Sequence, residues 1–120
     1  MNNRGYISKT KEACNGNING YLYALVDIEK NNGNVYSFSD DENYHLNNDI
    51  SYIGITNNPF ARLNNHRCKG KGKRIGMVIF GEPEDAMTGK MMEAKAIYDY
   101  CKIKGDAPLH QKGHDTWAGA

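Results

Sequence analysis

A short basic segment of the sequence has residue types that suit contact with phosphate groups. Six cations fall within thirteen residues that contain no acid, namely Arg62, Arg67, Lys69, Lys71, Lys73 and Arg74. Such a cluster is typical of a protein that binds a phosphate backbone, although a solvated basic loop would have the same composition. Arg62 also lies four residues before His66, so that on a helix the two side chains would share one face.

Hydrophobic patterning predicts the elements that must position these residues. Residues 20–29, 50–55 and 73–81 are rich in aliphatic, aromatic and β-branched side chains and predict three strands. Asn58 is a good N-cap and Pro59 suits the first helical position, so a short helix should carry Arg62 and His66. A longer helix should begin at residues 83–85 and stop at Gly105. This order predicts an α+β domain, with a small three-stranded antiparallel or mixed sheet flanked by helices.

The predicted long helix has an apolar stripe. Apolar residues recur there at helical period and should face the core: Met87, Met91, Ala94, Tyr98 and Cys101. Glu93 lies off the centre of this stripe, so by itself it would be an ordinary solvated acid. Residues 35–38 could start a returning strand, and the polar, acidic residues 40–48 predict a surface insertion.

Length and composition limit the class of protein. A chain of 120 residues makes one domain, which we expect over residues 20–120 after an irregular lead-in at residues 1–19. Apolar residues at 39% and charged residues at 24% exclude a charge-rich disordered chain. The longest apolar run covers only residues 77–80, and the N-terminal residues lack the apolar segment of a signal peptide. We therefore expect a cytoplasmic protein without a membrane partner.

Five residues form a pattern when the predicted elements are taken in order. Tyr-Leu-Tyr at residues 21–23 lies in the first strand, Tyr-Ile-Gly at 52–54 lies in the second, and the helices follow with Arg62, His66 and Glu93. By themselves the tyrosines would be strand packing and the two helix cations an exposed face. Together, over about residues 20–113, they resemble the GIY-YIG nuclease family, and residues 52–66 form the best-matched block.

The resemblance implies a metal-dependent endonuclease that hydrolyses DNA phosphodiester bonds. It implies that Glu93 holds one divalent ion, Mg²⁺ or Mn²⁺, and that Arg62 contacts the scissile phosphate. It also places Tyr23 near the attacking water, with Tyr52 and His66 completing the hydrogen-bond network. A guanidinium is always charged, and a single carboxylate leaves metal positions open for water and phosphate, so these residue types suit the chemistry. The general base would be Tyr23, if a cation favours its phenolate, or His66, whose ordinary pKa of about 6.5 suits neutral pH.

The sequence also departs from the family pattern. The first element reads Tyr-Leu-Tyr after Gly20, the connection to Tyr52 is long, and His110 stands where the family commonly has asparagine. An alternative is therefore a catalytically weak or inactive module that binds nucleic acid or a protein. In either case residues 67–74 are the expected contacts to the DNA backbone. Target choice would come from the domain itself, a homo-oligomer or a protein partner.

Overall fold

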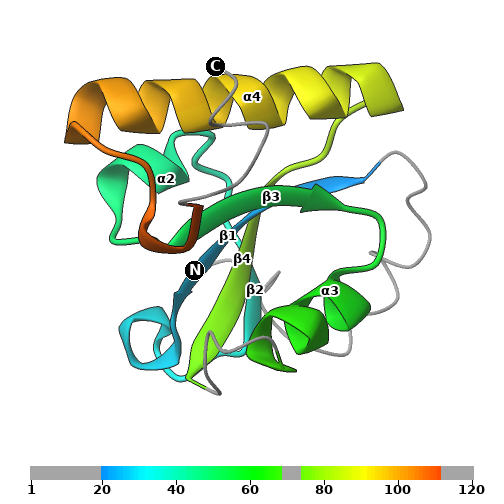
Figure 1. Cartoon of the computed structure of the whole chain (residues 1–120). Helices are drawn as coiled ribbons and strands as arrows, with labels where there is room; N and C mark the ends of the chain where they lie inside the picture. The colour runs from blue at the N-terminus through cyan, green and yellow to red at the C-terminus, as the bar shows by residue number, and fades with distance from the viewer. Residues whose placement is uncertain (1–19, 69–73, 112–120) are drawn as a thin grey trace.

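The computed structural model of the chain describes residues 20–68 and 74–111. One four-stranded sheet is formed by β1 (Tyr21–Asp27), β2 (Tyr36–Phe38), β3 (Tyr52–Thr56) and β4 (Ile75–Gly81). The α-helices are α2 (Tyr44–Asn47), α3 (Pro59–His66) and α4 (Ala86–Lys104), and two 3-10 turns are η1 (Ile28–Asn31) and η3 (Leu109–Gln111). The predicted α+β class is confirmed (Figure 1). The predicted lead-in, residues 1–19, lies outside the described residues.

The sheet has four strands in the order β2-β4-β1-β3, so the prediction of three strands was wrong. β1 is central and pairs antiparallel with both β3 and β4. The additional strand, β2, pairs parallel with β4, with Tyr36 opposite Met77. Both edges of β1 are already paired, and the segment that returns from the turn at Asn32 and Gly33 joins the sheet beside β4.

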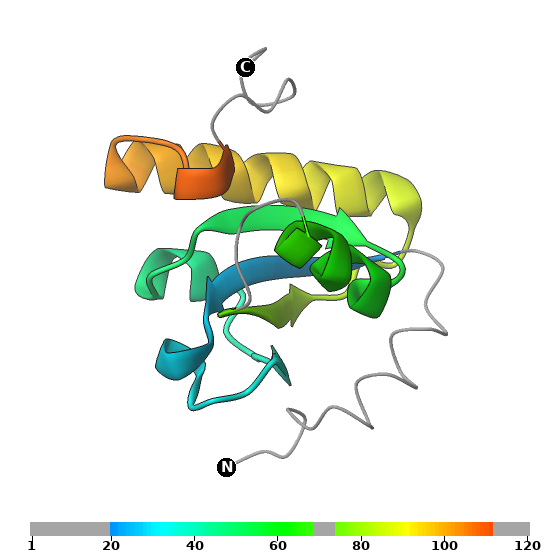
Figure 2. The same ribbon diagram turned by 60° about the horizontal axis from the view of Figure 1, so that its bottom comes forward.

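Alternation along β1 divides the core into two layers. Tyr21, Tyr23 and Leu25 face one side of the sheet, where Leu63 of α3 covers them. The residues between them face the other side and pack with Ala96 and Ile97 of α4. Figures 1 and 2 accordingly show α3 and α4 on opposite sides of the sheet. α4 contacts β3, which is an edge strand, so side chains of α4 can approach the α3 side of the sheet around this edge.

The long helix begins later than predicted. Its N-cap is Asp85, whose carboxylate accepts a hydrogen bond from the Thr88 backbone N–H at 2.7 Å, and its first residue is Ala86. The predicted stop is confirmed, since Gly105 adopts a left-handed conformation and its N–H donates to the Cys101 carbonyl. Asp85 therefore caps the helix rather than forming part of its first turn.

The buried face of α4 differs from the predicted stripe. Met87 and Met91 are 74% and 65% exposed, and Tyr98 is exposed as well. The buried residues are Gly89, Ala96 and Ile97. The apolar side chains of α4 are spread around most of its circumference, so the sequence allows an apolar stripe at helical period on more than one face. The small residues Gly89 and Ala96 allow α4 to pack closely against the sheet, and this packing selects the face.

The acidic insertion is not all surface, contrary to the prediction. Its residues include α2, and His45 of that helix is only 3% exposed. The imidazole stacks on Phe80 with 5.1 Å between ring centroids, and within the described chain neither ring nitrogen has a hydrogen-bond partner. One helical turn of the insertion therefore belongs to the second core layer. No helix among the described residues is long and apolar enough to cross a membrane.

Candidate active site

The site begins with a close approach between β1 and β3. Tyr23 lies directly opposite Gly54 in the antiparallel pairing. A Cβ added to Gly54 would lie 2.6 Å from the Tyr23 hydroxyl oxygen and 2.9 Å from Cε2 of Tyr52. Only a residue without a side chain lets the phenol ring cross β3 at this point. Gly54 is therefore required for the placement of Tyr23 and does not merely end a strand.

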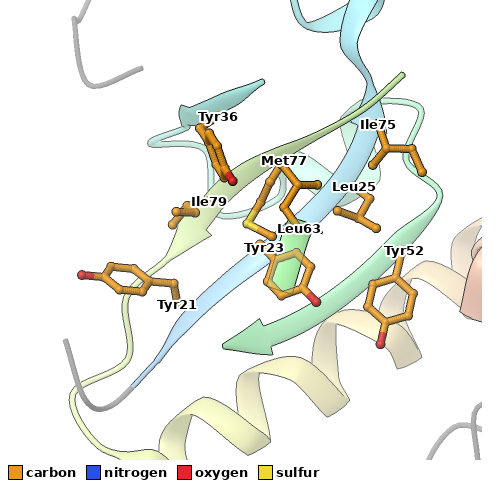
Figure 3. Packing of buried hydrophobic residues seen from close by; sticks show 9 residues of the cluster. All are labelled: Tyr21, Tyr23, Leu25, Tyr36, Tyr52, Leu63, Ile75, Met77 and Ile79. Carbon is orange, nitrogen blue, oxygen red and sulfur yellow. The ribbon is translucent and has the colours of Figure 1, made fainter. Parts of the chain in front are cut away.

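Tyr23, Tyr52 and His66 form one aromatic cluster on the α3 side of the sheet. The Tyr23 hydroxyl is hydrogen-bonded to His66 Nε2 at 2.9 Å. The Tyr52 and His66 ring centroids lie 4.7 Å apart, and the two tyrosine rings stack at 6.1 Å. Figure 3 shows both phenol rings on the same face of the sheet. All three side chains are buried, so the cluster is part of the core as well as a candidate site.

The sequence around α3 explains how His66 reaches the tyrosines. The Asn58 side chain accepts a hydrogen bond from Ala61 N–H at 3.2 Å, and Pro59 occupies the start of the helix, as predicted. Leu63 is buried against the sheet and fixes the rotation of α3. His66 follows Leu63 by three residues and is therefore turned inward as well. Arg62 remains exposed, so the two residues do not share one solvent-facing surface.

Charges from two helices act on the phenols. Burial is the largest cause that raises the pKa of Tyr23 above its ordinary value, and Tyr52 and Glu93 raise it further. Arg62 opposes this shift through its charge and through a hydrogen bond to the Tyr23 hydroxyl. Burial and Glu93 also raise the pKa of Tyr52, while Arg62 again lowers it. Arg62 and Glu93 therefore both lie near the two phenols, although they come from opposite sides of the sheet.

Glu93 is not the ordinary solvated acid that its position off the predicted stripe suggests. It lies four residues after Gly89 and four before Ile97, both of which are buried. Residues at this spacing form one row along a helix, so Glu93 belongs to the row that faces the sheet. Its side chain is only partly exposed. The rotation of α4 thus brings this carboxylate to the β3 edge and to the tyrosines.

The residues present suit a hard divalent cation bound through a single carboxylate. Within residues 20–68 and 74–111, no three His, Cys, Asp or Glu side chains gather in a way that could hold a metal ion. A divalent ion at the tyrosine cluster would have Glu93 as its carboxylate, because this is the acid whose charge acts on both phenols. Mg²⁺ commonly keeps several waters and binds through one or two carboxylates and substrate phosphates. The oxygen chemistry of Glu93 suits Mg²⁺ and Mn²⁺ alike.

Two of the predicted DNA-contacting residues have partners within the domain. The Arg67 Nε–H donates to the Ile75 carbonyl at 3.2 Å. Arg74 forms ion pairs with Glu29 at 2.7 Å and Asp27 at 3.6 Å. Solvent-exposed pairs of this kind are weak, so a phosphate could replace the acids around Arg74. Lys69, Lys71 and Lys73 lie outside the described residues.

Sequence reasoning missed Gln111. Its side-chain amide accepts from Ile53 N–H at 2.8 Å and donates to the Ile53 carbonyl at 2.9 Å, and the residue is completely buried. It therefore completes the outer edge of β3 between Tyr52 and Gly54. His110, the residue singled out, contributes its backbone N–H to the Ser51 carbonyl. A carboxamide one residue beyond the expected asparagine was the signal available in the sequence.

No protein-family model, curated protein or solved structure matches the chain. A functional interpretation therefore depends on the residues themselves and their arrangement. That arrangement brings Tyr23, Tyr52, Arg62, His66 and Glu93 together from four separate elements.

Proposed function

We propose that this chain is a metal-dependent endonuclease of the GIY-YIG type, which hydrolyses DNA phosphodiester bonds. The observation that carries the proposal is the convergence of an arginine and a glutamate on the hydrogen-bonded pair of Tyr23 and His66. Each of these residue types has a role in phosphodiester hydrolysis. Their order along the chain and the glycine at position 54 also fit the family pattern.

Arg62 and Glu93 supply the charges that the reaction needs. Arg62 is exposed and beside the phenols, so its guanidinium can donate to the phosphate oxygens on which negative charge builds up. Glu93 would hold the divalent ion, and Mg²⁺ or Mn²⁺ bound there would stabilise the leaving oxygen. Arg62 on one side and an ion held by Glu93 on the other would then fix the position of the scissile phosphate at the β3 edge.

Proton transfer is best assigned to Tyr23 and His66 as a pair. The raised pKa keeps the Tyr23 phenol neutral at neutral pH, which argues against a phenolate base. The Tyr23 hydroxyl lies 2.9 Å from His66 Nε2, and the neutral tautomer with an unprotonated Nε2 can accept the phenol proton. A proton lost by the attacking water would pass to the Tyr23 oxygen while the phenol proton passes to His66. His66 is then the final base and Tyr23 the relay.

Nicking of supercoiled plasmid in Mg²⁺, Mn²⁺ or EDTA tests the proposal. We expect metal-dependent nicking that falls about 100-fold or more in Glu93→Gln and Arg62→Ala, because each removes a charge used in the transition state. Glu84→Gln and Lys102→Ala are controls of matched charge, because both residues are exposed and neither is among the charges that shift the pKa of Tyr23 or Tyr52. Circular dichroism would verify that all variants fold.

Two outcomes would contradict the nuclease. Nicking by wild type in EDTA would refute the metal-dependent mechanism. Nicking by Glu93→Gln at the wild-type rate would refute it as well. Salt-dependent DNA binding without any nicking of plasmid, branched or single-stranded DNA would instead favour the module that binds nucleic acid without cleaving it.

A further inference from the structure

An open cleft lies beside the tyrosine cluster, between the end of β3, the helix α3 and the first turns of α4. Its volume is about 250 Å³, and its lining includes Thr56, Asn57 and Ala86 together with the cations Arg62 and Lys90. A water molecule occupies about 30 Å³ of liquid, so the cleft has room for more than a few waters. None of its described lining residues is acidic.

Lys90 faces this cleft from α4, one turn before Glu93. A spacing of three residues places the two side chains on neighbouring positions of the helix surface. At a rise of about 1.5 Å per residue, their Cα atoms are separated by about 4.5 Å along the helix axis. Lys90 thus lies next to the carboxylate that would hold the metal, on the side of the cleft opposite Arg62.

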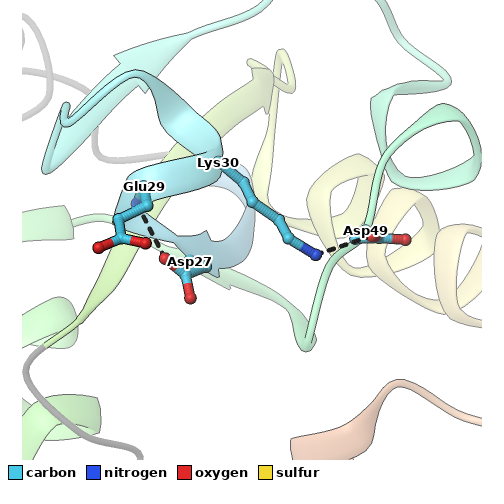
Figure 4. Close-up of polar contacts among 4 residues, drawn as sticks. All are labelled: Asp27, Glu29, Lys30 and Asp49. Atoms are coloured by element: carbon cyan, nitrogen blue, oxygen red, sulfur yellow. Dashed lines mark hydrogen bonds and ion pairs between the residues drawn. The ribbon is translucent and has the colours of Figure 1, made fainter.

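Lys90 differs from Lys30 and Lys95 in its lack of an acidic partner. Lys30 donates to Asp49 at 3.0 Å, as Figure 4 shows, and Lys95 is paired with Asp99 one turn along α4. Within the part of the chain that the structure describes, Lys90 takes part in no ion pair. Its ammonium group is therefore free to bind an anion that enters the cleft.

We propose that this cleft is a second phosphate-binding subsite, in which Lys90 binds the phosphate next to the one held by Arg62. The inference rests on the proposed nuclease function and adds the path of the substrate strand across α4. Successive phosphates of one strand follow each other every 3.4 Å or so along the duplex axis, so a neighbouring phosphate lies within reach of a flexible lysine. Among the described residues that line the cleft there is no acid, so no carboxylate of this lining repels a second phosphate.

The salt dependence of DNA binding in EDTA tests the subsite without requiring cleavage. Lys90→Ala removes one phosphate contact, so the slope of log K against log salt should decrease in magnitude by about 0.9. Between about 50 and 200 mM salt, wild-type affinity should therefore fall about 3.5-fold more than that of the variant. Lys90→Arg should retain the wild-type slope. Lys102→Ala, which removes an exposed lysine at the other end of α4, is the matched control and should behave as wild type.

The outcomes separate the subsite from the nuclease itself. If Lys90→Ala and Lys102→Ala bind DNA identically while wild type nicks plasmid, the subsite is refuted and the nuclease proposal stands. If wild type neither binds nor nicks DNA, both proposals are refuted. Both lysines are exposed on a helix where alanine is favourable, so neither variant should fail to fold.

Discussion

Replacing Gly54 with alanine should disrupt the fold and the candidate site together. The new Cβ would lie 2.6 Å from the Tyr23 hydroxyl oxygen and 2.7 Å from Cζ, where ordinary van der Waals contact is 3.4–4 Å. The ring must therefore move by about 1 Å within a packed core, and such overpacking typically destabilises by about 1–3 kcal/mol. The movement also removes the 2.9 Å hydrogen bond to His66, and an unsatisfied buried group adds about 1–3 kcal/mol. We expect a loss of about 2–6 kcal/mol in the free energy of unfolding.

A double-mutant cycle identifies the cause of that loss. Tyr23→Leu removes the ring atoms that the new Cβ would meet, so Gly54→Ala should destabilise this variant by at least about 1 kcal/mol less than it destabilises wild type. Urea unfolding followed by circular dichroism measures each corner of the cycle. Gly33→Ala is the control, because Gly33 has a φ of +79° but no atom within 4 Å of an added Cβ. Gly33→Ala acts through backbone strain alone, so the losses of stability caused by Gly33→Ala and by Tyr23→Leu should be additive.

Additive effects of Gly54→Ala and Tyr23→Leu on stability would refute a clash between the new Cβ and the Tyr23 ring. If Gly54→Ala changes stability by less than about 0.5 kcal/mol, or by the same amount with tyrosine or leucine at position 23, the ring does not require the glycine.

Two further predictions concern buried polar groups outside the tyrosine cluster. Gln111→Ala leaves the N–H and carbonyl of Ile53 without their partners, so urea unfolding should show a loss of about 2–4 kcal/mol, and a change below about 0.5 kcal/mol would contradict the role of the amide. Burial lowers the pKa of His45, so the unfolded chain binds more protons in mild acid, and stability should fall as pH decreases from above about 6.5. His45→Phe should reduce this pH dependence, and unfolding midpoints at pH values of about 7.5 and 5.5 measure it; an unchanged difference would refute the assignment to His45.

Local patterns predicted the elements of this fold better than their packing. Three strands were evident from continuous apolar runs, and the ends of α3 and α4 from Asn58 and Gly105. The parallel pairing of β2 with β4 depends on which edges of the sheet are open, which no local pattern records. The buried face of α4 was mispredicted because its apolar residues do not single out one face, and contact with the sheet decides the rotation.

The candidate site was predicted as a set of residues but not as a geometry. Spacing within one helix suggested that Arg62 and His66 share a face, whereas the structure buries His66 and leaves Arg62 exposed. Glu93 approaches the tyrosines only because α4 turns that row of residues toward the sheet. Gln111 and Lys90 become evident only when the edge of β3 and the cleft beside it are seen in three dimensions.

The burial of the tyrosine cluster has a consequence for how these residues vary among related proteins. Catalytic groups often lower the stability of a fold, so that their replacement stabilises it. Here Tyr23, Tyr52 and His66 fill the core, and their loss would weaken the sheet whether or not the protein cleaves anything. Selection for folding alone would therefore preserve them in a descendant that has lost activity. Arg62 is exposed and Glu93 is only partly buried, so if the proposed nuclease function holds, their presence or absence in a relative is the better indicator of activity.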